Sequence, residues 1–138
     1  MSNVAAHAEP TIIRRVFPHW SITVPAAFEE TFVHEDGYWH GWDNRGSVSL
    51  TSLVIADRQG RPVTSRRILE RFPAAPGSRV AMPTGLNGWA VDVAAEQPAR
   101  GSRAISGLIV VDGGVLITTV TAEDLAWATG VWRSIRRS

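Results

Sequence analysis

The chain contains no cysteine and no lysine. Without cysteine it can form no disulfide, thiolate zinc site, iron–sulfur cluster or thiol nucleophile, and it offers no acceptor for a bacterial lipoprotein anchor. Without lysine, Schiff-base catalysis and a P-loop lysine are excluded as well. All 14 basic residues are therefore arginine, and several large enzyme classes are ruled out by composition alone.

Long apolar runs are missing too. No segment approaches the ~20 residues that a membrane-spanning helix needs, and the opening MSNVAAHAEPT has neither the basic start nor the apolar centre of a secretory signal. We therefore expect a soluble, cytoplasmic protein with a flexible leader over 1–10 and a single globular α/β domain over 11–138. The net charge of +1 argues against nucleic acid or a membrane surface as a partner.

What the chain does contain is the pattern of an ordinary globular domain. Its 138 residues, 44% of them hydrophobic, are enough to build a core without metal or disulfide staples. Helices are predicted over 63–72 and over about 122–135, the second capped by Thr121. Alternating residues bounded by turn signals predict strands at 11–17, 21–24, 29–35, 38–43, 47–56, 79–82, 89–96, 103–111 and 115–121.

Residues 26–35 allow two interpretations. AAFEETF could form a helix that begins at Pro25, whereas EETFVHE alternates like a strand. The following Asp36-Gly37 favours the strand, because Asp-Gly is a strong two-residue hairpin signal. We therefore expect a hairpin of 29–35 with 38–43.

A second hairpin indicates the architecture. Asp112-Gly113-Gly114 joins two apolar runs, and the strand period makes both faces of this hairpin largely apolar. Both faces need cover, and the helices are available to give it. The expected fold is α+β, a mainly antiparallel β-sheet flanked by helices as an α/β/α sandwich. A helix-grip fold is the rival, although its long C-terminal helix fits poorly with the short one expected here.

Three stretches carry a resemblance to a known family. They are WSITVPAAF at 20–28, VTSRRILERF at 63–72 and GLIVVDGGVLITTVTAEDLAWATGVWRSIRR at 107–137, the last a strand–hairpin–helix ending. Their order resembles the PsbP-like α/β/α sandwich superfamily, which includes photosystem extrinsic subunits, a Ran-binding nuclear import factor and uncharacterised bacterial proteins. The resemblance implies that fold and a binding or accessory role without catalysis. It supplies no motif residues that can be placed on this chain.

The stretch 36–55 holds a dense group of aromatic residues, with Tyr38, Trp39 and Trp42 around His40. Strand alternation places Tyr38, His40 and Trp42 on one face and Trp39 on the other. We predict that Tyr38, His40 and Trp42 form a contact surface, because tyrosine and tryptophan are favoured anchors at interfaces.

The histidines do not predict a metal site. A two-residue turn at Asp36-Gly37 pairs residue 34 with residue 39, which directs His34 and His40 to opposite faces of the sheet. His34 and Asp43 could instead form an orienting pair of the kind that tunes a histidine as a general base. No cofactor, metal ligand or catalytic residue is predicted.

The sequence thus favours a non-catalytic binding or accessory domain that contacts a protein partner through the aromatic hairpin, with a second copy of the chain as one candidate. The alternative is a small-ligand-binding protein or enzyme with a pocket between sheet and helix, polar at His40 or His34. A third hypothesis is an accessory of a secretion or toxin–immunity system. No motif decides among them.

Overall fold

The computed structural model describes residues 10–33, 35, 37–95 and 102–138. The expected leader over 1–10 lies outside this part of the chain, apart from Pro10. In chain order the elements are β1 (Thr11–Phe17), β2 (Trp20–Pro25), β3 (Glu29–Val33), β4 (Tyr38–Trp42), β5 (Gly46–Val54), α1 (Ser65–Arg71), β6 (Ser78–Arg79), β7 (Asn87–Ala94), β8 (Arg103–Val111), β9 (Gly114–Ala122), α2 (Leu125–Arg133) and β10 (Arg136–Arg137).

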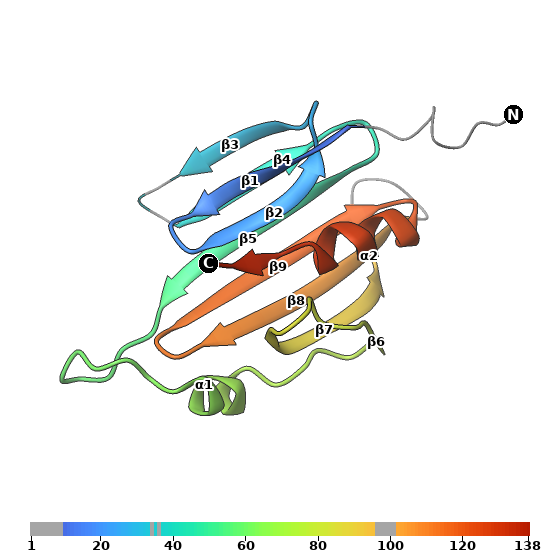
Figure 1. The fold of residues 1–138 in the computed structure, drawn as a ribbon. Coiled ribbons are helices and arrows are strands. Elements are labelled where there is room, and N and C mark those ends of the chain that lie inside the picture. The colour runs from blue at the N-terminus through green and yellow to red at the C-terminus, as the bar shows by residue number, and fades with distance from the viewer. Residues whose placement is uncertain (1–9, 34, 36, 96–101) are drawn as a thin grey trace, which may run out of the picture.

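Seven of the strands form one sheet in the order β3-β4-β5-β9-β8-β7-β6 (Figure 1). All of its pairings are antiparallel. Strands β1, β2 and β10 form a separate three-stranded sheet. The prediction of an α+β fold built on a mainly antiparallel sheet is confirmed.

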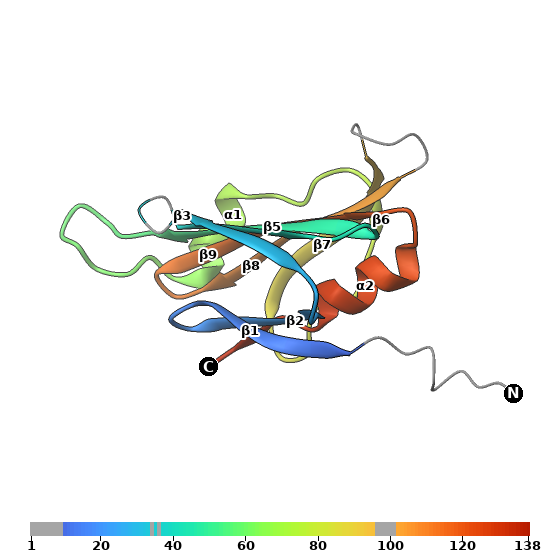
Figure 2. The same cartoon turned by 90° about the horizontal axis from the view of Figure 1, so that it is seen from above.

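The two faces of the large sheet are covered differently (Figure 2). Helix α2 and the three-stranded sheet lie over one face, and α1 lies on the other. The first layer encloses the main core, in which Trp39, Leu50 and Trp132 are fully buried. The sequence predicts helices alone as cover. In the structure a sheet shares one layer with α2, because the alternating Ile22 and Val24 make the β1–β2 hairpin a half-apolar layer of its own.

The C-terminal helix is shorter than the predicted 122–135. Asp124, and not Thr121, is its N-cap, and the Asp124 carboxylate accepts hydrogen bonds from two first-turn amides at 2.9 and 3.3 Å. Strand β9 continues through Thr121, which removes that residue from the helix. Ala128 and Trp132 of this helix are buried, whereas Leu125 in its first turn is exposed. Arg136 and Arg137 lie in β10, beyond the helix, although the Arg136 guanidinium still donates a hydrogen bond of 2.7 Å to the carbonyl of Arg133, the last residue of α2.

The second face of the large sheet is covered only in part. Ile68 of α1 packs there with Leu108, Val110 and Val115, near the β8–β9 turn. Thr64 caps this helix through its hydroxyl, close to the predicted start of the segment 63–72. No helix packs against the rest of this face, over β3, β4 and the opposite end of β9, within the part of the chain that the structure describes.

The β3–β4 hairpin has a different register from the predicted one. Val33 lies opposite Tyr38, so four residues make the connection in place of a two-residue Asp36-Gly37 turn. Gly37 has a φ of 61°, and its carbonyl accepts a hydrogen bond of 2.8 Å from the Ser52 amide. A Cβ at Gly37 would collide with the Ser52 carbonyl oxygen. The observed register differs from the predicted one by two residues. Because side chains alternate with a period of two, every side chain of β4 keeps its predicted face.

Candidate functional site

The uncovered half of the second face is mostly polar and partly aromatic. We call it the aromatic face. Strand register places these side chains on it: Glu29, Thr31, Val33, Tyr38, His40, Trp42, Ser47, Ser49, Thr51, Ser106, Thr119 and Thr121. Thr119, near its middle, is exposed, and the three aromatic side chains of β4 are half-buried. The face therefore continues the same sheet surface that α1 covers, but it is open to contact.

Tyr38, His40 and Trp42 form a stacked row along β4. The rings of Tyr38 and His40 lie 6.3 Å apart with an interplanar angle of 6°. The rings of His40 and Trp42 lie 5.3 Å apart at 25°. Trp39 points into the core on the other side and is 0% exposed. The structure therefore brings the three predicted contact residues together and separates Trp39 from them.

Ser49 is part of this arrangement, and sequence reasoning did not single it out. It lies opposite His40 across β4 and β5. Its hydroxyl oxygen lies 2.9 Å from His40 Nδ1 and 3.3 Å from the Tyr38 hydroxyl. The contact of Ser49 with His40 follows from the pairing of β4 with β5. The alternation of residues within a single strand does not reveal that pairing. Ser49 thus holds two of the three rings in place.

A serine hydroxyl beside an imidazole is also the first contact of a nucleophile–base pair. Such a pair needs a third group that orients the histidine and a cavity that encloses the substrate. No described residue is hydrogen-bonded to the other ring nitrogen of His40, and neither His40 nor Ser49 lines the main cavity described below. The predicted orienting pair cannot supply this group, because His34 lies outside the described residues and the Asp43 carboxylate contacts Arg45. The geometry of Ser49 and His40 therefore favours a role in binding over a role in catalysis.

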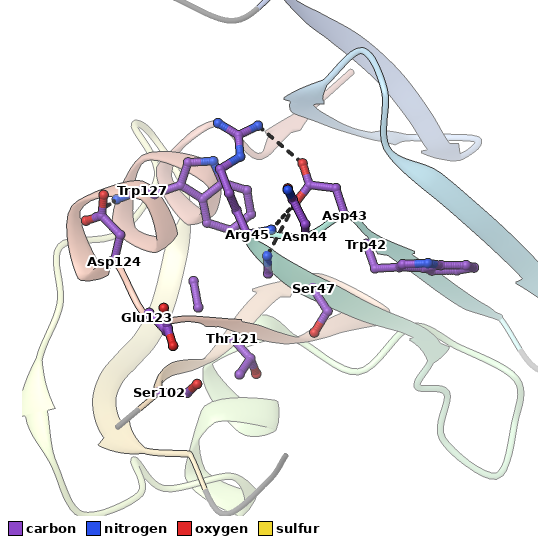
Figure 3. Close-up of a pocket in the computed structure, with 12 residues that line it drawn as sticks. Trp42, Asp43, Asn44, Arg45, Ser47, Ser102, Thr121, Glu123, Asp124 and Trp127 are labelled. Carbon is purple, nitrogen blue, oxygen red and sulfur yellow. Dashed lines mark hydrogen bonds and ion pairs between the residues drawn. The ribbon is translucent and has the colours of Figure 1, made fainter. Parts of the chain in front are cut away.

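A cavity of about 550 Å³ adjoins the row at its Trp42 end (Figure 3). It lies where β4 ends, β5 begins and β9 runs into α2. Its lining residues are Trp42, Asp43, Asn44, Arg45, Gly46, Ser47, Ser102, Thr121, Ala122, Glu123, Asp124 and Trp127. The predicted pocket between sheet and helix therefore has a counterpart, but its polar groups come from the ends of three strands and not from His40.

Asp43 and Arg45 shape one wall of this cavity. One oxygen of Asp43 accepts hydrogen bonds from the amides of Arg45 and Gly46 at 2.8 and 3.3 Å, which fixes the β4–β5 turn. The other oxygen lies 3.2 Å from the Arg45 guanidinium. The guanidinium in turn lies 5.5 Å from the centre of the Trp127 ring, a cation–π contact. The Arg45 side chain is therefore held by Asp43 from its own turn and by Trp127 from α2.

Neither a metal cluster nor a membrane-spanning helix is found. Among the described residues, no three histidine or carboxylate side chains converge closely enough to hold a metal ion. Both described helices are too short to cross a bilayer.

Comparison with known proteins shows the fold alone. No family model matches the chain, and no curated protein matches it either. A crystal structure from Bacteroides thetaiotaomicron VPI-5482 is similar over 86% of this chain and 45% of that one, with a TM-score of 0.53 and 13% identity. The chain thus spans less than half the length of that structure. An identity this low carries no inference about activity or ligands.

Proposed function

We propose that this is a non-catalytic binding domain that contacts a protein partner through the aromatic face. The observation that carries the proposal is the half-covered second face of the sheet. Beyond the apolar cluster under α1, most side chains on this surface are uncharged and Glu29 at the β3 edge carries a formal charge, although 20% of the chain is charged. Interface cores are depleted of charged residues and enriched in tyrosine and tryptophan.

The stacked row makes this surface ordered before any partner binds. Because the rings of Tyr38, His40 and Trp42 stack on one another along the strand, each ring limits the rotation of its neighbour. The contacts of Ser49 with Tyr38 and His40 restrict the rotamers further. Side chains that are already fixed lose little conformational entropy on association, which favours binding.

A second copy of the chain is the partner that can be tested first. Two copies of a face whose charge is confined to Glu29 at its edge can approach one another with little of the repulsion between like charges that suppresses many self-contacts. Sedimentation equilibrium over a range of concentrations measures this association directly. If the chain stays monomeric throughout, the partner must be a different protein, recovered by cross-linking and affinity capture and then verified with both proteins purified.

Charge insertion tests whether the aromatic face is the contact surface. Thr119→Arg places a cation at an exposed position in the middle of the face and should weaken partner binding at least tenfold. Glu70→Arg places the same side chain on exposed α1 and is the matched control, for which we expect no change. Unaltered binding by the Thr119 variant, with its fold intact by circular dichroism, would show that the surface is wrongly assigned.

We further infer a relationship to the PsbP-like α/β/α sandwich superfamily and a cytoplasmic, bacterial setting. The strand–hairpin–helix ending of β8, β9 and α2 supports the relationship, and a chain without cysteine suits a reducing compartment. The three-stranded sheet beside α2 is the feature to compare. A superposition in which PsbP-like proteins lack any counterpart of the β1–β2 hairpin would count against this inference.

A further inference from the structure

Three hydroxyl groups line the floor of the 550 Å³ cavity without a hydrogen-bond partner among the described residues. Ser47 and Thr121 are direct neighbours across β5 and β9, and Ser102 immediately precedes β8. Figure 3 shows the three in a row that begins near Trp42, with Arg45 and Trp127 above it. Ser102 is only 6% exposed, yet no described residue is hydrogen-bonded to its hydroxyl. Because no described residue engages these three hydroxyls, they are available to a ligand that both donates and accepts hydrogen bonds.

Trp42 gives the same cavity an aromatic wall. His40 covers one side of its ring at 5.3 Å, since the two stack along β4. Trp42 ends the row, and it also lines the cavity. An indole in this position can pack against a flat apolar face of a ligand while the hydroxyl groups bind its polar edge.

The charges of the lining exclude anionic ligands. Three carboxylates, on Asp43, Glu123 and Asp124, stand against the single guanidinium of Arg45, which leaves a formal charge of −2. Arg45 is already engaged by Asp43 and Trp127, and Asp124 caps α2. The carboxylate of Glu123 forms no hydrogen bond with any residue in the described part of the chain. A phosphate or carboxylate would therefore be repelled, whereas a neutral or cationic group would not.

We infer that this cavity binds a small polyhydroxyl compound, neutral or carrying an amine, of about the size of a monosaccharide. Its volume of 550 Å³ falls within the range of roughly 300–1,000 Å³ typical of small-molecule sites. The apolar C–H face of a pyranose matches Trp42, its hydroxyls match Ser47, Ser102 and Thr121, and an amine would lie near Glu123. The cavity adjoins the aromatic face, with which it shares Trp42, Ser47 and Thr121 at the boundary.

Titration of the whole chain with defined sugars tests the inference. Methyl glucoside, glucosamine and inositol serve as neutral and amine-bearing probes, and glucose 6-phosphate serves as the anionic counterpart. We expect saturable shifts of the Trp42 indole N–H signal in nitrogen–proton correlation spectra with at least one of the first three. Glucose 6-phosphate should bind more weakly than the neutral methyl glucoside. The inference is overturned if none of the three gives a saturable shift, or if the phosphate ester binds as well.

Variants locate the binding and separate it from the protein contact. Thr121→Val keeps the side-chain shape and removes one hydroxyl, which should weaken sugar binding about three- to tenfold, the worth of one neutral hydrogen bond. Thr119→Val, two residues away on the same face of β9 but outside the cavity, is the matched control and should bind normally. Equal loss in both variants, or none in either, would contradict the assignment. Tyr38→Ala removes a ring that lies outside the cavity, so it should weaken partner binding more than sugar binding.

Discussion

Trp132 packs directly onto the backbone of Gly107. A Cβ atom at position 107 would overlap the six-membered ring of the indole. The ring is 0% exposed, and its N–H donates a hydrogen bond of 2.9 Å to the carbonyl of Ala81. This contact holds α2 against the middle of the large sheet, on the face that the three-stranded sheet also covers.

Gly107→Ala should therefore destabilise the fold. The added methyl group cannot be accommodated unless Trp132 moves, and overpacking of this kind costs about 1–3 kcal/mol. Urea unfolding followed by tryptophan fluorescence measures the loss. Gly130→Ala in α2 is the control, because a Cβ there meets no atom within 4 Å. That variant should gain stability from helix propensity, about 0.5–1 kcal/mol, and a loss of equal size in both would contradict the explanation.

Thr118→Val should stabilise the protein. The Thr118 side chain is fully buried, and its hydroxyl has no hydrogen-bond partner among the described residues. Valine has the same shape without a polar group to desolvate, so we expect the free energy of unfolding to rise by about 1 kcal/mol. Thermal unfolding by calorimetry provides the measurement. Thr119→Val, on the exposed side of the same strand, should change stability far less; a lower midpoint for Thr118→Val would mean that the hydroxyl is satisfied in solution.

Ser49→Ala should loosen the row of rings without unfolding the sheet. The substitution removes the oxygen that contacts both His40 and Tyr38, which should cost about 0.5–1.5 kcal/mol of stability. Partner affinity should fall more than stability does, because the rings then lose order before binding. Calorimetric titration with the partner and a matched Ser106→Ala control measure the difference. Equal losses of partner affinity in Ser49→Ala and Ser106→Ala would show that Ser49 does not order the rings.

Asp57 should keep its charge to unusually low pH. The backbone amide of Arg61 is the main cause that holds the pKa of this carboxyl below its ordinary value of 3.8. The folded-state pKa is the lower one, so the contribution to stability is present above 3.8 and is lost as the pH falls through the folded value. Amide shifts of Gln59 and Arg61 followed during acid titration report it. A midpoint above 3.8 would mean that these contacts do not form in solution.

Alternation within strands was enough to predict much of the fold and the face of each candidate residue. The bounds of β8 agree with the predicted 103–111, and the opposite faces of Trp39 and His40 follow from a period of two. The register of the β3–β4 hairpin was not predictable, because Gly37 is held by Ser52 of β5. The local Asp-Gly signal contains no information about that contact.

The second sheet and the cavity depend on contacts between distant segments, so the sequence did not reveal them. β2 pairs with β10, which consists of Arg136 and Arg137 at the other end of the chain. Two-residue strands have no periodicity to detect. The cavity likewise forms only when the β4–β5 turn meets the end of β9 near Glu123. Single residues such as Ser102 gave no local signal of that meeting.

The position of Trp42 at both sites makes them thermodynamically linked. A sugar that orders this indole from the cavity side reduces the conformational entropy that the ring loses when a protein partner binds. The coupling is reciprocal, so the partner changes the affinity for the sugar by the same factor. The domain would then report the occupancy of a small cavity through its affinity for another protein. Such a reporter requires no hinge and no movement of the sheet.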